Sequence, residues 1–288
     1  MRIAVTGASG FIGGALCDAL RAAGHAVLTL GRSSGERRWD PMAGPAPLEG
    51  TDAAVHLAGE PVAAGRWSAA KKQRIRDSRV LGTRNLVAGM KAAGTRTLVC
   101  ASATGYYGDR GDEDLTEDSP PGADFLAGVC REWEEEAAGS GVRTVSVRIG
   151  IVLGDGGALA KMLTPFRLGL GGRLGSGRQW MSWIHVDDLV ALFLHALASE
   201  SLSGPLLGTS PGPVTNREFT RALGRGLRRW TFLPMPAWPL RIIMGPVAEV
   251  LLGSQRCRPK RTLGSGFAFR HPDLEPALAR ILHPGPAV

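Results

Sequence analysis

Gly7, Gly10 and Gly13 have the spacing of a turn that binds a dinucleotide. They follow a short apolar strand, residues 2–6, and lead directly into a helical pattern, a context that a purely structural glycine turn rarely has. The first glycine allows the tight turn, the second lets the backbone approach a pyrophosphate, and the third lets the helix pack closely on the strand. The helix N-terminus adds free N–H groups and a positive dipole end. We therefore predict a phosphate cradle whose further cofactor contacts are Ser9, Phe11 and Ile12.

A second apolar strand, residues 26–30, ends close to Arg32, which indicates the kind of dinucleotide. Sites for NAD usually place Asp or Glu here to accept a hydrogen bond from the ribose 2′-hydroxyl. An acidic side chain would repel a 2′-phosphate, whereas a guanidinium binds one through two charge-assisted hydrogen bonds. The sequence therefore favours NADP(H) over NAD(H). The competing interpretation of Arg32 is an ordinary solvated loop arginine.

The first half of the chain alternates strands and helices that would position these residues. Repeated strand–helix units imply a parallel sheet with right-handed crossovers, and ligands of such sheets lie at the carboxyl ends of the strands. Two further segments, Leu57-Ala58-Gly59 and Ser102–Tyr107, fall at predicted strand ends and should join the cradle there. The strands expected beyond the first two are 53–57, 97–101 and 143–149, and the later helices are 67–92 and 125–138.

The second half breaks this rhythm with a glycine-dense loop, residues 169–178, and then a short, proline-rich remainder. We expect a doubly wound, Rossmann-type α/β domain over 1–155 with a return segment near 184–200. Most of 156–288 should form a smaller substrate-binding domain. Arg173 and Arg178 in the loop would clamp an anionic substrate, or they belong to a plain surface loop.

Composition restricts the class of protein. The chain has 288 residues, 44% of them hydrophobic, and a formal net charge of +8. No uninterrupted apolar run reaches membrane-spanning length, and a core strand at the start predicts no signal peptide. Scattered cysteines without a CxxC motif predict a reducing, cytoplasmic setting without a metal site. The one dense group of arginines fits a solvated helical face, so a small molecule, and neither nucleic acid nor membrane, is the expected partner. The dense arginines are Arg221, Arg225, Arg228 and Arg229.

Characteristic motifs occur at 6–13, 56–59, 82–86, 102–108 and 184–188, and together they resemble an extended short-chain dehydrogenase/reductase. Three further segments, 66–79, 168–185 and 258–274, resemble more narrowly the uncharacterised epimerase family proteins. Those proteins are similar to NAD-dependent epimerases/dehydratases and carry a C-terminal domain of unknown function. The resemblance implies a Rossmann domain followed by a small C-terminal domain, without implying a substrate.

This chain departs from the family in its proton relay. Extended members carry Tyr-x-x-x-Lys on the helix after the acidic loop, where the lysine lowers the tyrosine pKa from about 10 toward the working pH. Counted back from Glu134, those two positions hold Leu126 and Cys130, and no Tyr-x-x-x-Lys occurs anywhere in the sequence. The usual epimerase chemistry is therefore not inherited from the resemblance.

The remaining catalytic candidates lie at the end of the fourth strand. Ser102 matches the family's hydroxyl that binds the reacting carbonyl, although a hydroxyl that merely ends the strand is equally compatible. Strand alternation directs only one of Tyr106 and Tyr107 toward the cofactor, and the sequence leaves open which. Arg79 stands where the family usually has Asn. Two interpretations are open: its side chain reaches a cofactor phosphate, or it is an ordinary exposed helix arginine.

Two hypotheses follow. The first is an NADP(H)-dependent oxidoreductase that moves hydride between the nicotinamide and a carbonyl or alcohol carbon, with a non-standard proton donor. The second is an NADPH-binding sensor or scaffold without catalysis, which the missing Tyr/Lys pair supports.

Overall fold

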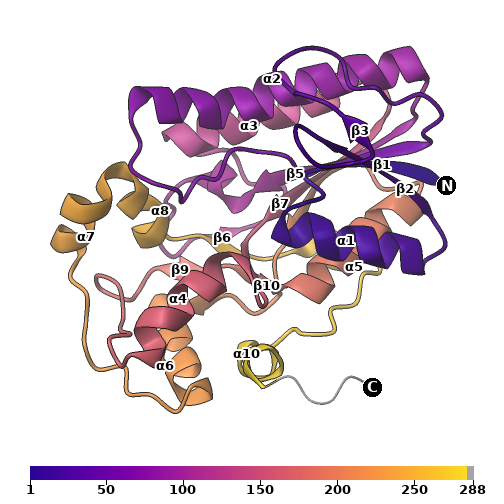
Figure 1. The fold of residues 1–288 in the computed structure, drawn as a ribbon. Helices are drawn as coiled ribbons and strands as arrows, with labels where there is room; N and C mark the ends of the chain where they lie inside the picture. The colour runs from indigo at the N-terminus through magenta and orange to yellow at the C-terminus, as the bar shows by residue number, and fades with distance from the viewer. Residues whose placement is uncertain (284–288) are drawn as a thin grey trace.

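A seven-stranded parallel sheet forms the centre of the computed structural model, which describes residues 1–283 (Figure 1). From β1 the chain continues to β2 on one side and returns to β4 on the other, which makes this the switch point of a doubly wound sheet. The predicted Rossmann-type fold is confirmed. In spatial order the strands are β11 (Gly204–Gly208), β7 (Arg143–Ile149), β5 (Thr97–Ala103), β4 (Ala53–His56), β1 (Arg2–Thr6), β2 (Ala26–Gly31) and β3 (Arg37–Arg38).

Two helical layers cover the sheet, and alternate residues of each strand face one layer or the other. Ile3 and Val5 of β1 pack in the cluster shared with α1 (Phe11–Ala22) and α5 (Val186–Ala198). Ala4, between them, packs in the opposite cluster, beneath α2 (Ala69–Ala93) and α3 (Phe125–Ala138). Figure 1 shows these two helix pairs above and below the sheet. The strands are therefore apolar on both faces, as expected of a buried parallel sheet.

Local signals set the ends of the long helices. The Ser68 hydroxyl accepts a hydrogen bond from the Lys71 amide at the start of α2, and Gly94 ends that helix in the left-handed conformation with φ of 71°. The Asp124 carboxylate caps α3 through the Ala127 amide. These are the residue types expected at such positions, and they explain why both helices begin and end within two residues of the predicted bounds.

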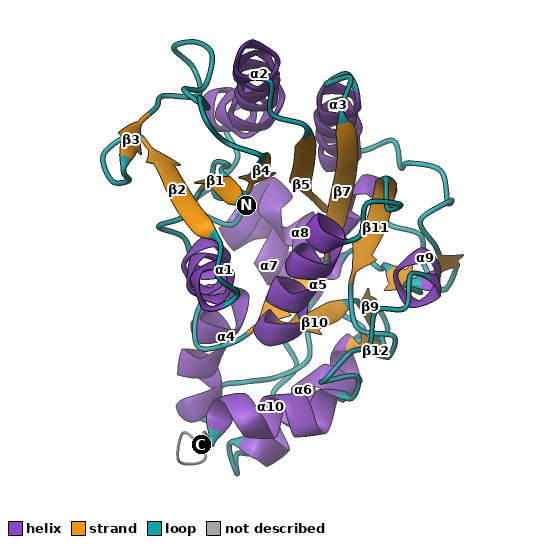
Figure 2. Ribbon diagram, turned by 90° about the vertical axis from the view of Figure 1, so that its right-hand side faces the viewer, coloured by secondary structure: helices purple, strands orange, loops and turns teal. Residues whose placement is uncertain are grey.

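The rest of the chain forms a smaller unit with its own apolar cluster, which includes Trp183, Phe219 and Leu278. Its helices are α4 (Gly157–Arg167), α6 (Asn216–Gly226), α7 (Ala237–Met244), α8 (Ala248–Leu252) and α10 (Leu274–Leu282), whereas α9 (Lys260–Gly264) contacts β11 of the central sheet. Figure 2 shows α4, α6 and α10 below the sheet. Its strand pairs are β8 (Ile151–Leu153) with β10 (Trp183–His185), β9 (Trp180–Met181) with β12 (Val214–Thr215), and β6 (Asp114–Leu115) with β13 (Arg256–Cys257).

The return to the first domain is longer than the predicted segment near 184–200. After α5 the chain adds β11, which pairs in parallel with β7 at the edge of the central sheet. The sequence of β11, Gly-Pro-Leu-Leu-Gly, offers only two consecutive apolar side chains between a proline and a glycine, which is too weak a pattern to predict a strand. Within residues 1–283 no helix is both long enough and apolar enough to cross a membrane.

Candidate cofactor and catalytic site

The turn after β1 has the geometry of a phosphate cradle. Gly7 has φ of 72°, and a Cβ there would lie 2.8 Å from the Ala58 amide nitrogen, so only glycine fits. A Cβ at Gly13 would lie 2.1 Å from the Gly7 carbonyl oxygen, which shows how closely α1 packs on the turn. Gly10 precedes the first helical residue, Phe11, and provides no side-chain cap. The first N–H groups of α1 are therefore left available to an anion.

Thr6 and His56 hold the ends of β1 and β4 together beside this turn. The Thr6 Oγ1 accepts hydrogen bonds from the Leu57 and Ala58 amides, each at 3.2 Å, and lies 2.6 Å from the His56 Nδ1. Because this oxygen already accepts two amide protons, its own proton points to Nδ1. Burial lowers the pKa of His56 to about 4, so the ring is neutral at physiological pH. The pairing of Thr6 with His56 was not apparent from the sequence, since the two residues lie 50 positions apart.

Arg32 lies exposed at the end of β2, in a loop that a neighbouring glycine makes possible. A Cβ at Gly31 would lie 2.0 Å from the Ser34 carbonyl oxygen, so the chain turns tightly here. The Arg38 Nε donates a hydrogen bond to the Arg32 carbonyl oxygen at 3.0 Å. A second exposed guanidinium, that of Arg38, therefore stands beside this loop, and no local pattern in the sequence had indicated it. Neither Arg32 nor Arg38 has a carboxylate partner among residues 1–283.

Arg79 is half-buried at the strand end, and it is not the exposed helix arginine that one interpretation expected. Its Nη1 donates to the carbonyl oxygens of Glu60 and Ile75, each at 3.1 Å. Its guanidinium lies 5.3 Å from the Trp133 ring centroid and borders the backbone of Gly59. The side chain thus supports the segment after β4, and a direct contact with a cofactor phosphate stays a prediction.

Ser102 belongs to a buried charged cluster at the carboxyl end of the sheet. Its hydroxyl donates to the Glu134 Oε1 at 2.6 Å. Arg148 binds the same carboxylate through two hydrogen bonds, Nε to Oε1 at 2.9 Å and Nη2 to Oε2 at 2.8 Å. The side chains of Arg148 and Glu134 are only 4% and 15% exposed. The ion pair therefore anchors the Glu134 side chain of α3 inside the protein.

Burial opposes the charge of Arg148, but the hydrogen bonds and the charge of Glu134 outweigh that effect and raise the arginine pKa. Arg148 therefore keeps its charge and holds the Glu134 carboxylate to which the Ser102 hydroxyl donates. The structure brings Ser102 and Arg148 together because they are direct partners in the register of β5 and β7. Arg148 lies inside the strand 143–149, where a buried parallel strand usually has apolar residues, and this was the sequence signal for the cluster.

The structure distinguishes the two adjacent tyrosines. Tyr107 is fully buried, donates to the Thr116 carbonyl oxygen at 2.9 Å and accepts from Arg148 at 2.9 Å. Burial raises its pKa, which makes it a poor proton donor or acceptor and identifies it as the core tyrosine of the pair. Tyr106 is half-buried, and the Arg148 guanidinium lies 3.5 Å from its ring centroid. Of the two phenols, only that of Tyr106 remains available to a ligand.

Leu126 and Cys130, the residues at the Tyr and Lys positions, lie on α3 as the spacing predicted. The Leu126 side chain borders Gly105, on the short turn after β5. Burial raises the pKa of the Cys130 thiol to about 12, so it is neither a cation nor a thiolate at neutral pH. These positions can therefore neither donate a proton as the usual tyrosine does nor stabilise a phenolate as the usual lysine does.

His185, Asp187 and His271 form the one group of ligand-type side chains, among residues 1–283, that could hold a metal ion. The His185 Nδ1, however, already accepts a hydrogen bond from the Asp187 amide at 3.1 Å and caps α5. Burial, and next the adjacent His271, lower the pKa of His185, so it stays neutral. This geometry gives His185 a structural role at the start of α5.

The fold and the site residues agree with the families and relatives that this chain resembles. The model of the NAD dependent epimerase/dehydratase family matches residues 3–205, and that of a domain of unknown function, DUF1731, matches residues 235–281. Epimerase family protein Mb2239 of Mycobacterium bovis is 44% identical in an alignment of 288 positions that covers 96% of each chain. Human epimerase family protein SDR39U1 is 39% identical in an alignment of 293 positions that covers 98% of this chain and 100% of the human one.

Solved structures give the same result. The crystal structure of human SDR39U1 with NADPH has a TM-score of 0.91 and 37% identity, and the match covers 98% of this chain and 99% of that one. A nucleoside-diphosphate sugar epimerase from Corynebacterium glutamicum has a TM-score of 0.80 and 36% identity, over 98% of this chain and 58% of that one. The chain thus belongs to the NAD dependent epimerase/dehydratase family, in the group of epimerase family proteins that end in the DUF1731 domain.

Proposed function

We propose that this protein is an NADP(H)-dependent oxidoreductase that acts on a carbonyl or alcohol carbon of a small molecule. The observation that carries the proposal is the convergence of three features at the carboxyl ends of the parallel strands. They are the glycine cradle after β1, the exposed Arg32 and Arg38 after β2, and the ordered Ser102 hydroxyl at the end of β5. Ligands of doubly wound sheets bind at this edge.

The choice of NADP(H) rests on charge. No acidic side chain takes the ribose-binding position after β2, and the two exposed arginines there suit a 2′-phosphate. The human relative was crystallised with NADPH, which supports the same choice. When bound, NADP(H) supplies or accepts a hydride at its nicotinamide ring. The protein contributes the α1 N-terminus and the loop after β2 as binding groups for its phosphates.

Ser102 would bind the substrate oxygen. Its hydroxyl donates to Glu134, so its oxygen can accept a hydrogen bond from a substrate alcohol. For a carbonyl substrate, the hydroxyl would turn its proton from Glu134 to the carbonyl oxygen. Glu134 and Arg148 are positioning residues in this scheme, since they orient Ser102 without reaching the reacting carbon. Tyr106 offers the phenol placed nearest to this hydroxyl in the sequence and is the second catalytic candidate. Tyr107, which the sequence left as an equal candidate, serves the core.

A second candidate function, an NADPH-binding sensor or scaffold, has one specific observation in its favour. Leu126 and Cys130 place an apolar side chain and a protonated thiol where the family has its proton relay. Cofactor binding would survive this replacement, whereas rapid proton transfer would not. The two functions therefore differ in turnover and agree in cofactor affinity.

A two-stage experiment distinguishes these functions. NADPH and NADH are first titrated by cofactor fluorescence, and we expect NADPH to bind at least about tenfold more tightly. The NADPH complex is then mixed with a panel of aldehydes and ketones, and single-turnover oxidation is followed by absorbance. Oxidation that depends on Ser102 supports the enzyme. Tight NADPH binding with no oxidation across the panel favours the sensor, and equal affinities for the two cofactors contradict the NADP(H) assignment.

For the compartment we propose the cytoplasm. All four cysteines are free and buried, as is common in proteins of reducing compartments. One relative, from Arabidopsis thaliana, is named chloroplastic.

A further inference from the structure

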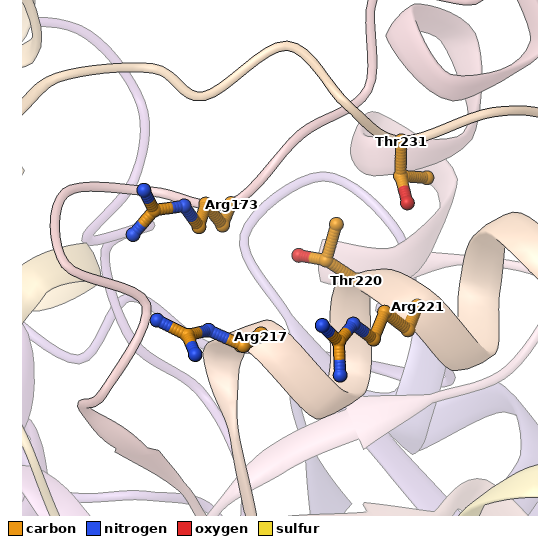
Figure 3. Close-up of a pocket in the computed structure, with 5 residues that line it drawn as sticks. All are labelled: Arg173, Arg217, Thr220, Arg221 and Thr231. Atoms are coloured by element: carbon orange, nitrogen blue, oxygen red, sulfur yellow. The ribbon is translucent and has the colours of Figure 1, made fainter.

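A basic hollow lies in the smaller unit, on residues that the proposed redox chemistry does not use. Its volume is about 240 Å³, and its lining comes from the loop before β9, from α6 and from the loop after α6. Figure 3 shows that three arginine side chains and two threonine hydroxyls surround the same space. The lining residues are Arg173, Arg217, Thr220, Arg221 and Thr231.

The backbone fixes the positions from which the arginines extend. Arg217 and Arg221 are one turn apart on α6 and therefore share a helix face. The Arg217 amide donates to the Gly177 carbonyl oxygen at 2.9 Å, which ties α6 to the glycine-dense loop. The Arg173 Nη1 donates to the Ser176 carbonyl oxygen at 2.7 Å. A Cβ at Gly177 would lie 3.2 Å from Arg173 and 3.4 Å from Arg217, so this glycine lets the two side chains come close.

The charges of the three arginines are not balanced by the protein. No carboxylate among residues 1–283 lies within ion-pair distance of Arg173, Arg217 or Arg221, whereas Arg225, one turn further along α6, pairs with Glu275. Like charges that share one space repel each other, and an anion between them would turn that repulsion into attraction. Planar guanidinium groups are also the side chains that best match phosphate oxygens.

Thr220 provides a second, independent indication of a ligand. The residue is only 3% exposed, yet its side chain lines the hollow. In Figure 3 its hydroxyl points toward the space between the arginines. This hydroxyl makes no side-chain hydrogen bond in the part of the chain that the structure describes, and it opens onto the hollow, where a ligand can reach it. A bound anion would accept its proton.

We propose that this hollow binds the phosphoryl group of a small phosphorylated molecule, independently of the dinucleotide. Its volume is smaller than the roughly 300–1,000 Å³ of pockets for drug-sized ligands, so it suits a charged group and not a whole nucleotide. Arg178, in the same loop, does not line it. Of the two loop arginines considered from the sequence as an anion clamp, Arg173 alone takes part. Arg228 and Arg229 also fall outside, because α6 ends at Gly226 and the predicted helical face stops there.

Pyrophosphate is the probe, and its binding is measured by calorimetry at low ionic strength. Arg217→Gln should weaken binding about tenfold or more, since one charge-assisted contact is lost. Thr220→Val keeps the shape and removes only the hydroxyl, and it should weaken binding about fivefold, the effect of one neutral hydrogen bond. Arg178→Gln is the matched control, an exposed arginine of the same loop, and should leave binding unchanged. If Arg217→Gln does not fold, Arg221→Gln replaces it.

The cradle after β1 also suits pyrophosphate, so Gly10→Val is tested in parallel. The proposal requires that Gly10→Val retains pyrophosphate binding and that Thr220→Val weakens it. Binding that is lost in Gly10→Val and unchanged in the Arg217 and Thr220 variants would assign the probe to the cradle and overturn the proposal. Equal weakening by Arg178→Gln would show unspecific attraction by the basic surface, and absence of binding to the unmodified protein would also refute the site.

Discussion

The buried ion pair between Glu134 and Arg148 should contribute far more to stability than an ion pair of the same type two residues away. In the Glu134→Gln variant, Arg148 keeps its charge, although its side chain is only 4% exposed, and loses its carboxylate partner. Two charge-assisted hydrogen bonds, at 2.9 Å and 2.8 Å, are lost or weakened, as is the bond from Ser102 at 2.6 Å. Removing one partner of a buried pair typically costs about 3–5 kcal/mol.

Glu136 provides the control, because it lies on the same helix and also binds an arginine, Arg84, through two nitrogens. The Arg84 side chain is 58% exposed, so water replaces the lost partner. Glu136→Gln should therefore cost at most about 1 kcal/mol.

Urea unfolding followed by circular dichroism measures both free energies of unfolding. We expect Glu134→Gln to lower the free energy at least about 2 kcal/mol more than Glu136→Gln, a difference that follows from the two quoted ranges. Equal losses in the two variants would refute the argument that burial of Arg148 makes the pair decisive. Glu134→Gln should also reduce any single-turnover rate with little change in NADPH affinity, because Ser102 loses its orientation.

Four further predictions follow from the site. Arg32→Asp should reverse the preference for NADPH over NADH in fluorescence titrations, because the carboxylate repels a 2′-phosphate and accepts from a 2′-hydroxyl; an unchanged preference would contradict the role of Arg32. Gly10→Val should abolish NADPH binding while circular dichroism shows an intact fold, and normal affinity would disprove the cradle. Ser102→Ala should slow single-turnover NADPH oxidation about 10²-fold, as expected when a positioned hydrogen-bonding group is lost. Unchanged rates in both Ser102→Ala and Tyr106→Phe would favour the sensor function over the enzyme. His56 has a folded-state pKa of about 4, below its ordinary value of 6.5, so as the pH falls the unfolded chain binds a proton at this residue before the folded chain does. The free energy of unfolding should therefore decrease as the pH drops from about 6.5 to 4, by at most roughly 1.4 kcal/mol per pH unit from this group. If a His56→Asn variant shows the same dependence of stability on pH, this prediction is contradicted.

The sequence by itself determined the features that depend on neighbouring residues. Gly7, Gly10 and Gly13 stand within one strand–turn–helix unit, so their spacing was sufficient to predict the tight turn into α1 that the structure has. The alternation of strands and helices predicted the parallel sheet, because each unit is local and right-handed crossovers leave few topologies. A strand such as β11, with two apolar residues beside a proline, was not predictable, since only its pairing with β7 makes it a strand.

The tertiary structure decided what depends on residues far apart in the chain. Ser102, Glu134 and Arg148 meet only through the register of β5 and β7 and the packing of α3, and no local pattern encodes that register. The same packing made Tyr107 a core residue and left Tyr106 available. The basic hollow likewise needs the loop at Arg173 to lie against α6, more than 40 residues later in the chain. Local spacing therefore predicts which chemical groups are present, whereas long-range packing determines which of them meet, because burial and pairing arise only when distant segments contact each other.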